Sequence, residues 1–420
     1  MDTILSNSQS EPSNDVFSLS NEVLSERLQF IQEIGFGNWG SVWLCQPRPV
    51  TAPDGSVRPL GQKLAVKLVH RSKTPTTAAR VRSLWNEMKI IKSLKSEPHP
   101  SIIPFHSFII TPSYALITMS YLPTLVPVEV EESKAQEWFR FLLSGVEFLH
   151  TRGVVHNDIK PANILLSHKN IPVLVDFGFA EKYETSSDTA FHSNLSYGTP
   201  EYLSPERARG LPHDTRKSDV WSLGVTFFEI LVGRTPFEKS DGEQFSSKED
   251  LEKYWERTLR GKWVGKWKFS QGIERLLQRM ISPNADLRCT AKQAMADMYW
   301  RSDKKDTLHS KMHSELSVIS NVELPIFTQF IGRASSYAST TTSSVVFERD
   351  LDQLLSMTPS SQKKKSEEGI NMRSPPGLDL FRDLPVDSST PTGEAKPRTA
   401  IPRTKSQPRV AVHPNSMFQL

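Results

Sequence analysis

The order of the apolar patterns constrains the fold of this chain more than any other feature of its sequence. Segments typical of β-strands come first, and four of them can be placed: LQFIQEIG (28–35), SVWLC (41–45), KLAVKLV (63–69) and SYALITMSY (113–121). Beyond them the apolar residues recur mostly at helical spacing, as in the stripe from Ala135 to Leu149. The sequence therefore predicts an α+β fold with two lobes, a small β-rich N-lobe and a larger helical C-lobe.

Two helices can be located from the same pattern. The first follows the third strand and is marked by apolar residues at helical spacing: Val81, Leu84, Trp85, Met88 and Ile91. Ser133 and Gln136 predict a capping box at the start of the second helix, which carries the stripe that ends at Leu149. Gly153 is expected just past its end, because glycine accepts the left-handed backbone that often follows a helix.

The composition indicates that part of the chain is not packed into a core. Apolar residues make up 37% of the chain, below the roughly 45–50% typical of compact soluble proteins, a figure that includes glycine. We expect residues 1–26 to be a flexible leader and residues 27–301, which hold all nine tryptophans, to be the folded domain. Residues 302–420 are expected to be a low-complexity, disordered regulatory tail with too little apolar surface to offset ordering entropy.

Charge, cysteine content and hydropathy exclude several classes of protein. A net charge of +4 is ordinary and gives no case for nucleic-acid binding. Cys45 and Cys289 are too few for a disulfide framework and suit a reducing compartment. No apolar run approaches the roughly 18–20 residues that span a bilayer, and the N-terminus lacks the features of a secretory signal. We therefore expect an intracellular protein, cytoplasmic and/or nuclear.

A glycine-containing turn joins the first two predicted strands. Gly35, Gly37 and Gly40 have the GxGxxG spacing, which lets a backbone approach phosphate oxygens closely because no Cβ intervenes. By itself this pattern also fits a chance turn or a dinucleotide-binding fold. A strand rather than a helix follows these glycines, which argues against the dinucleotide-binding arrangement.

Lys67 lies inside the apolar third strand. It is either an edge lysine that extends to water or a cation directed at nucleotide phosphates, and the second role requires an acidic partner. Glu87, in the middle of the first predicted helix, is the candidate partner, although a lone glutamate on a helix usually faces solvent.

A loop after the second predicted helix carries the residue types that phosphoryl transfer requires. Asp158, Lys160 and Asn163 stand close together in VHNDIKPANILL (155–166) and supply a base, a cation and a metal-binding amide. Further along, the apolar run VLV leads into Asp176 of a DFG sequence, where a second metal ligand is expected.

The complete set of motifs resembles the eukaryotic protein kinases over about residues 27–301. The glycine turn, the AVK lysine, the helix glutamate, the HxDxKxxN loop and DFG occur in the family order, followed by GTPEYLSPE (198–206) and DVWSLG (219–224). Lys160 beside Pro161 and Thr199 in GTPEY resemble the serine/threonine type. The surroundings of DVWSLG are weakly similar to calmodulin-kinase and AMPK-type relatives.

The resemblance implies roles for individual residues. Asp158 would be the catalytic base, and Lys160 would neutralise charge on the transferred phosphate. Lys67 would contact the α- and β-phosphates of ATP and would be held by Glu87. Asn163 and Asp176 would bind Mg²⁺. The residues expected to bind the nucleotide are Ile34, Gly35, Phe36, Gly37, Asn38, Trp39, Gly40, Val42, Ala65, Lys67, Met119, Ser120, Leu122 and Leu165.

Within this set the adenine would lie between Val42, Ala65 and Leu165. It would hydrogen-bond to backbone groups around Ser120 and Leu122, with Met119 as the gatekeeper residue before them.

The implied function is an ATP- and Mg²⁺-dependent serine/threonine protein kinase that transfers the γ-phosphate of ATP to Ser/Thr hydroxyls of protein substrates. The alternative is a pseudokinase, a scaffold that binds nucleotide or partners without transfer. The presence of Lys67, Glu87, Asp158, Asn163 and Asp176 argues against that alternative. Regulatory partners are expected to bind through the C-terminal tail.

Two departures from the family pattern affect regulation and substrate choice. Asn157 stands where many kinases have an arginine that pairs with a phosphorylated activation loop, so control by phosphorylation of Thr189 or Ser193 is not expected. The stretch from Leu122 to Ser133 is short, which predicts that the helix usually found after this segment is trimmed or missing. The acidic residues of this stretch are expected to open the next helix instead.

Three further interpretations concern packing. Arg288 is expected to pair with Glu206, and His156 is expected to be buried near Phe177, Ile91 and Phe105. LRGKWVGKWKF (259–269) mixes basic and aromatic residues, and packing against the core is favoured over nucleic-acid binding. The insert at 46–63 is expected to be a solvated, Pro-rich loop.

Overall fold

The computed structural model describes residues 15–37, 40–49, 61–71, 75–239, 243, 245 and 247–302. The chain divides into two units, Met1–Leu355 and Ser356–Leu420, and every described residue belongs to the first. The expected tail beyond residue 302 and most of the insert at 46–63 lie outside the described residues.

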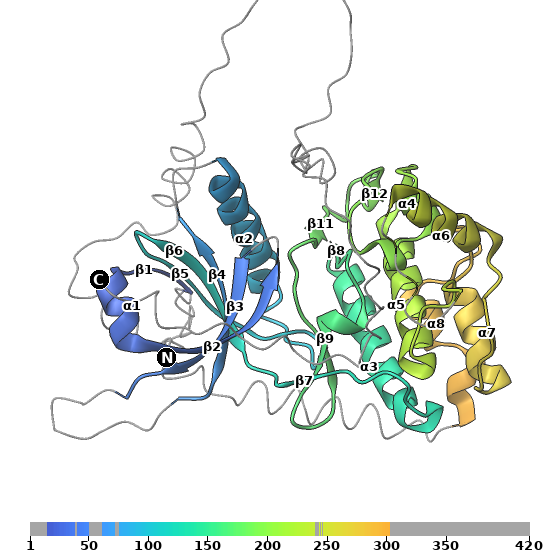
Figure 1. The fold of residues 1–420 in the computed structure, drawn as a ribbon, viewed down its shortest axis with the longest axis horizontal. Helices are drawn as coiled ribbons and strands as arrows, with labels where there is room; N and C mark the ends of the chain where they lie inside the picture. The colour runs from blue at the N-terminus through green and yellow to red at the C-terminus, as the bar shows by residue number, and fades with distance from the viewer. Residues whose placement is uncertain are drawn as a thin grey trace, which may run out of the picture. The chain divides into compact units, whose positions relative to one another are not determined.

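Six strands form one sheet in the first lobe, with the spatial order β1-β5-β6-β4-β3-β2. The strands are β1 (Val16–Ser18), β2 (Leu28–Gly37), β3 (Gly40–Pro47), β4 (Leu64–His70), β5 (Phe105–Ile110) and β6 (Tyr114–Ser120). Neighbouring strands are antiparallel except β1, which runs parallel to β5. The helix α2 (Pro75–Ser93) packs on this sheet (Figure 1).

The central strand β4 is buried on both sides of the sheet. Val69 belongs to the main core, which includes the apolar residues of α2. Leu64, Val66 and Leu68 belong to a second cluster, which includes Leu24 from the helix α1 (Asn21–Arg27). Burial on both faces explains why this strand has an almost continuous apolar sequence rather than an alternating one.

Residues 15–26, expected as part of a flexible leader, instead form β1 and most of α1. Phe17 and Leu24 are buried in the second cluster, and the side-chain hydroxyl of Ser20 accepts a hydrogen bond from the N–H of Val23 at the start of α1. The carboxylate of Asp15 is 2.6 Å from the ammonium of Lys95. A three-residue strand is too short to show periodicity, so the sequence pattern did not reveal it.

The second lobe is built around two long helices, α3 (Glu132–Thr151) and α5 (Thr215–Val232). Phe139 and Phe227 stack between them with their ring centroids 3.9 Å apart. The remaining α-helices are α4 (Pro205–Ala208), α6 (Lys248–Arg260), α7 (Gln271–Met280) and α8 (Ala291–Met295), and 3₁₀-helices span Pro161–Asn163, Pro200–Tyr202 and Met298–Ser302. In Figure 1 these helices make up the green to orange part of the ribbon.

Seven short strands, β7 to β13, lie in the part of the chain that carries the HxDxKxxN loop and the DFG sequence. One sheet has the order β10-β9-β7, and the pairs β11-β8 and β12-β13 form two more. Their bounds are β7 (Thr124–Leu125), β8 (Val154–Val155), β9 (Ile164–Leu166), β10 (Pro172–Leu174), β11 (Glu181–Lys182), β12 (His192–Ser193) and β13 (His213–Asp214).

The start of α3 differs from the predicted capping box. The helix begins at Glu132, with Glu131 in the N-cap position, so Ser133 already lies within the first turn and makes no cap. The carboxylate of Glu132 instead accepts hydrogen bonds from Ser270 and from the hydroxyl of Tyr299. No helix occurs between residues 121 and 131, a stretch that is fully described, as the short spacing predicted.

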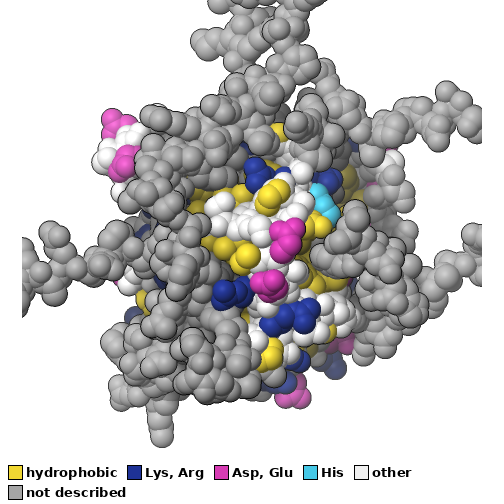
Figure 2. Space-filling view, turned by 90° about the vertical axis from the view of Figure 1, so that its left-hand side faces the viewer, with side chains coloured by type: hydrophobic (Ala, Val, Ile, Leu, Met, Phe, Trp, Pro, Cys, Tyr) yellow, Lys and Arg dark blue, Asp and Glu magenta, His cyan; other side chains and the backbone are white. Residues whose placement is uncertain are grey.

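The segment 259–269 packs as the favoured interpretation predicted. Trp263, Trp267 and Phe269 each approach the ring of Phe228, with centroid distances of 5.2 to 5.9 Å. On the face drawn in Figure 2, described side chains of both charge signs lie among hydrophobic ones, and neither sign dominates. No helix in the described part of the chain is long and apolar enough to cross a membrane.

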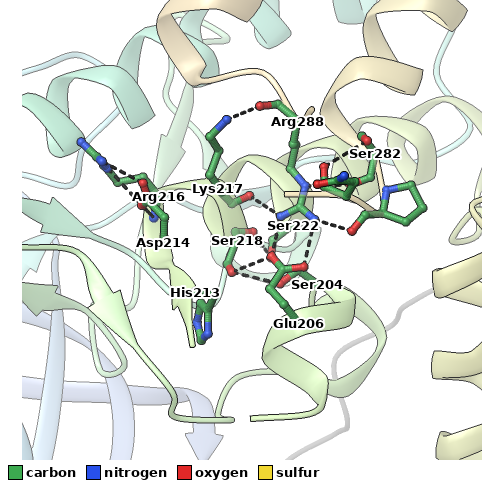
Figure 3. Close-up of polar contacts among 12 residues, drawn as sticks. Ser204, Glu206, His213, Asp214, Arg216, Lys217, Ser218, Ser222, Ser282 and Arg288 are labelled. Carbon is green, nitrogen blue, oxygen red and sulfur yellow. Dashed lines mark hydrogen bonds and ion pairs between the residues drawn. The ribbon is translucent and has the colours of Figure 1, made fainter. Parts of the chain in front are cut away.

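An ion pair between Glu206 of α4 and the buried Arg288 links this helix to the loop before α8 (Figure 3). Nη1 of Arg288 is 2.6 Å from Oε1 of Glu206, and Nη2 is 3.0 Å from Oε2, which makes the pair bidentate. Nη1 also donates to the carbonyl oxygen of Lys217 in α5, and Nε donates to that of Ser282. The predicted pairing of these two residues is confirmed.

We predict that Glu206→Gln lowers the free energy of unfolding at neutral pH by about 3 kcal/mol, because the buried guanidinium of Arg288 loses its charged partner. Burial raises the pKa of Glu206, but the hydrogen bonds and charge of Arg288 outweigh burial and hold it below its ordinary value of 4.5. In the wild type, the stabilisation from the ion pair of Glu206 with Arg288 is therefore complete above pH 4.5. It is lost as the pH falls through the lower pKa that Glu206 has in the folded protein.

Urea unfolding at a series of pH values checks this prediction. The difference in the free energy of unfolding between wild type and Glu206→Gln should decrease as the pH falls below 4.5. Glu26→Gln, on an exposed part of α1, is the control and should follow the wild type at every pH. A gap of constant size across the series would contradict the prediction.

We also predict that Leu24→Ala lowers the free energy of unfolding by about 3 kcal/mol, since it leaves a cavity beneath α1. Leu24 is 4% exposed in the wild type. Denaturant unfolding measures the effect, with Glu26→Ala on the exposed side of the same helix as control. A loss equal to that of the control would show that residues 15–27 do not pack on the sheet.

Candidate active site

Lys67 brings three distant parts of the chain together. Its ammonium on β4 is 2.7 Å from Oε2 of Glu87 on α2 and 2.7 Å from Oδ1 of Asp176, which follows β10. Glu87 therefore does not face solvent, although a lone helical glutamate usually does. The expected pairing of Lys67 with Glu87 is what the structure shows.

The charges of this cluster stabilise one another. Burial lowers the pKa of Lys67, but the carboxylates of Glu87 and Asp176 outweigh burial and raise it above its ordinary value. Burial also raises the pKa of Asp176, and the neighbouring ammonium of Lys67 outweighs that effect and lowers it. Burial raises the pKa of Glu87, and the ammonium of Lys67 offsets this effect only in part, because the carboxylate of Asp176 also raises it. The shifts of Lys67 and Asp176 thus favour a charged ammonium beside a charged carboxylate at neutral pH.

Both carboxylate oxygens of Asp158 have polar partners. Oδ1 accepts hydrogen bonds from the N–H of Thr199, at 3.0 Å, and from its hydroxyl, at 2.6 Å. Oδ2 lies 2.8 Å from the ammonium of Lys160 and accepts a hydrogen bond of 2.9 Å from the amide of Asn163. Asp158, Lys160 and Asn163 therefore form one network, and their carboxylate is held in a single orientation.

A buried carboxylate on α5 fixes the loop that carries Asp158. Asp219 is 1% exposed and accepts hydrogen bonds from the backbone N–H groups of His156 and Asn157, at 2.9 and 2.8 Å. Nε2 of His150 lies 3.0 Å from the same carboxylate. The sequence motif DVWSLG contains Asp219, but no local spacing indicated this contact across the lobe.

His156 is buried, as predicted. Its ring lies 4.8 Å from that of Phe177, and both residues are at most 1% exposed. Ile91 and Phe105 are buried in the main core together with Phe177.

The glycine turn lies between β2 and β3. Gly35, Phe36 and Gly37 end β2, and Gly40 begins β3 with a φ of 133°. A Cβ on Gly40 would lie 2.3 Å from the carbonyl oxygen of Leu68, so only glycine fits there. The predicted site residues Asn38 and Trp39, at the tip of the turn, lie outside the described residues.

Strand register places the other N-lobe residues of the predicted nucleotide site. Val42 lies opposite both Gly35 and Lys67, and Ala65 lies opposite Met119. Met119, next to the last residue of β6, is 7% exposed, whereas Ile34 on β2 is exposed.

The remaining residues of the predicted adenine site follow β6. Ser120 ends this strand, and Leu122 is partly buried against the main core. Leu165 lies on β9, opposite Leu125 of β7. Within the described residues, no hydrogen bond uses the peptide N–H of Leu122, so this group is free to donate to a ligand.

The side-chain oxygens of Asn163 and Asp176 are suited to bind Mg²⁺ together with a nucleotide. The nitrogen of the Asn163 amide is bonded to Asp158, which leaves its oxygen as the atom that can bind a metal. The side chain of Asp176 is 44% exposed while that of Lys67 is 7% exposed, so the carboxylate is open on one side. Asp176 also has a φ of 60°, a strained conformation typical of functional sites. Oxygen ligands are those that Mg²⁺ prefers.

Asn157 contacts three parts of the chain, and sequence reasoning missed these contacts. Its amide nitrogen donates to the carbonyl oxygen of Phe179 at 3.0 Å and to the hydroxyl of Tyr197 at 3.2 Å. Its amide oxygen accepts a hydrogen bond of 2.8 Å from Nη1 of Arg207. Nothing in the local sequence around Arg207 or Thr199 indicated that either residue reaches the loop at 156–163.

The sequence of the chain is similar to those of known protein kinases. The chain is similar to CBL-interacting serine/threonine-protein kinase 18 of Arabidopsis thaliana, with 28% identity over 303 residues that cover 70% of this chain and 53% of the relative. It is also similar to CBL-interacting protein kinase 4 of Oryza sativa subsp. japonica, with 29% identity over 249 residues that cover 57% and 52% of the two chains. The chain thus spans about half the length of the curated relatives it matches.

A family model described as the protein kinase domain matches residues 28–300, well over half of the chain. The predicted two-lobed α+β fold and the predicted family are both confirmed. The chain belongs to the protein kinase domain family.

Proposed function

We propose that this protein is an ATP-dependent serine/threonine protein kinase that transfers the γ-phosphate of ATP to hydroxyl groups of protein substrates. The observation that carries this proposal is the ammonium of Lys67, which bridges Glu87 and Asp176 at 2.7 Å each. This arrangement presents one buried cation beside an open carboxylate, as binding of a magnesium-bound triphosphate requires. One of the similar proteins, from Arabidopsis thaliana, is named a serine/threonine-protein kinase.

The residues of the N-lobe bind and orient the nucleotide in this proposal. The backbone between Gly35 and Gly40 covers the phosphates, and Lys67 contacts them while Glu87 holds its ammonium in place. The free N–H of Leu122 donates to the adenine. Asn163 and Asp176 would hold Mg²⁺, which would supply positive charge to offset the charge of the phosphates.

Asp158 acts on the substrate hydroxyl. Its carboxylate orients the hydroxyl and accepts its proton, while Lys160 neutralises charge on the transferred group. The hydrogen bonds from Thr199 and Asn163 to the two oxygens of Asp158 hold the carboxylate in position. Catalysis then consists mainly of positioning and electrostatic stabilisation.

The first test is phosphate transfer from labelled ATP with Mg²⁺ to a degenerate Ser/Thr peptide library. We expect the phosphatase-treated protein to be active, and Lys67→Met and Asp176→Ala to lower the rate by about a thousandfold or more, because each removes charge that acts on the phosphates. Lys266→Met, at an exposed lysine, is the matched control and should keep full activity.

Circular dichroism and thermal unfolding establish that each variant is folded. Near wild-type activity in folded Lys67→Met or Asp176→Ala would refute the site assignment. An inactive wild type that still binds ATP would favour the pseudokinase scaffold instead.

A second prediction concerns Thr199. Thr199→Val removes the hydroxyl that bonds to Asp158 and Lys160, and we expect kcat to fall about tenfold because the carboxylate loses a partner. Thr199→Ser keeps the hydroxyl and should keep most of the activity. Steady-state kinetics on one peptide substrate measure both variants, and equal kcat values for Val and Ser would exclude this role.

A further inference from the structure

Arg207 is a buried arginine in α4, 1% exposed. Its Nη1 donates to the amide oxygen of Asn157 at 2.8 Å, and its guanidinium carbon lies 4.5 Å from the ring centroid of Tyr197. Its Nε and Nη2 atoms are buried and have no hydrogen-bond partner within the described residues. A buried guanidinium with two unpartnered nitrogens is costly, so its few contacts need an explanation.

Those contacts converge on the activation segment, which we define as residues 176–206. The amide nitrogen of Asn157 bonds to Phe179 near the start of this segment and to Tyr197 near its end. The rings of Phe179 and Tyr197 are themselves stacked, 5.9 Å apart with an interplanar angle of 12°. Arg207 completes this cluster, since it contacts both Asn157 and Tyr197.

An arginine in place of Asn157, in addition to Arg207, would conflict with this arrangement. The amide oxygen of Asn157 is the hydrogen-bond acceptor for Arg207, whereas an arginine side chain offers only donors. It would also bring a second positive charge to the same buried place, where like charges repel strongly. An arginine at 157 and an arginine at 207 are therefore alternatives for the same space.

We infer that Arg207 is a positioning residue that supplies, from α4, the buried guanidinium that many kinases carry at the position of Asn157, and that it orders the activation segment without a phosphate. This inference rests on the proposed kinase function. It explains how a chain with asparagine at 157 holds Phe179 and Tyr197 together through hydrogen bonds, ring stacking and one cation over an aromatic face.

The test is a double-mutant cycle at positions 157 and 207 in the phosphatase-treated full chain. Arg207→Leu should lower kcat/KM for a peptide substrate at least about tenfold, mainly through a higher peptide KM, while the Kd for ATP changes less than about twofold. Asn157→Arg alone should also lose activity about tenfold, because it places two guanidinium groups together. Arg209→Leu, at an exposed arginine that directly follows the same helix, is the control and should behave as wild type.

The combined variant Asn157→Arg/Arg207→Leu is the decisive measurement. An arginine at 157 can reach the space that Arg207 leaves, and its donors can replace those of the asparagine amide. We therefore expect kcat/KM to return to within about threefold of wild type. A merely structural role of Arg207 predicts no such rescue, so a double variant no more active than the worse single variant overturns the inference.

Hydrogen exchange of the peptide amides in residues 179–197 is a readout that does not depend on catalysis. Exchange should be faster in each folded single variant and should return toward wild type in the double variant. If Arg207→Leu does not fold, Asn157→Arg alone remains informative, because its full activity or unchanged exchange would overturn the inference.

Two further outcomes separate this inference from the proposed function. A wild type without phosphate transfer refutes the proposed function, while the exchange measurements still decide the role of Arg207. A many-fold gain in wild-type activity on phosphorylation of Thr189 or Ser193 overturns the inference that the segment is ordered without a phosphate.

Discussion

The buried ammonium of Lys67 is the constraint on which the rest of the site depends. A charged group that is 7% exposed needs acidic partners, and it has two of them, Glu87 from α2 and Asp176 from the loop after β10. The position of α2 on the sheet and the conformation of the DFG sequence are thus linked through one side chain. The apolar packing of α2 against β4 supports the same geometry, because Val81, Met88 and Val69 share the main core.

A second buried polar group organises the helical lobe in a similar way. Asp219 accepts two backbone hydrogen bonds from the loop at 156–157, so the rigid helix α5 determines where Asp158 is presented. Asn157 extends this network to the activation segment through Phe179 and Tyr197. Because the N–H groups and oxygens of this network are largely satisfied, it holds one conformation instead of several.

The N-terminal residues add a feature that the resemblance did not lead us to expect. Asp15 and Val16 reach the region of α2, one through the ion pair with Lys95 and the other through the main core. Phe17 and Leu24 cover the opposite side of the sheet. This segment therefore contacts both hydrophobic clusters of the N-lobe and contributes to the surroundings of the helix that carries Glu87.

The sequence by itself determined four of the six strands of the large sheet (β2, β3, β4 and β6), the helices α2 and α3, and the family. The strand β5 was not predicted. The sequence also determined the motif residues Lys67, Asp158, Asn163 and Asp176, because periodicity and motif spacing are properties of neighbouring residues. It did not determine which partners these residues have. Lys67 and Asp176 are 109 positions apart, and Asn157 and Arg207 are 50 apart, so only folding brings them together. The strand at Val16–Ser18 could not be predicted either, since three residues show no periodicity and form a strand only by pairing with β5. Burial decided the role of Glu87. A helical glutamate ordinarily faces water, but Glu87 pairs with Lys67 because both side chains lie where water is excluded.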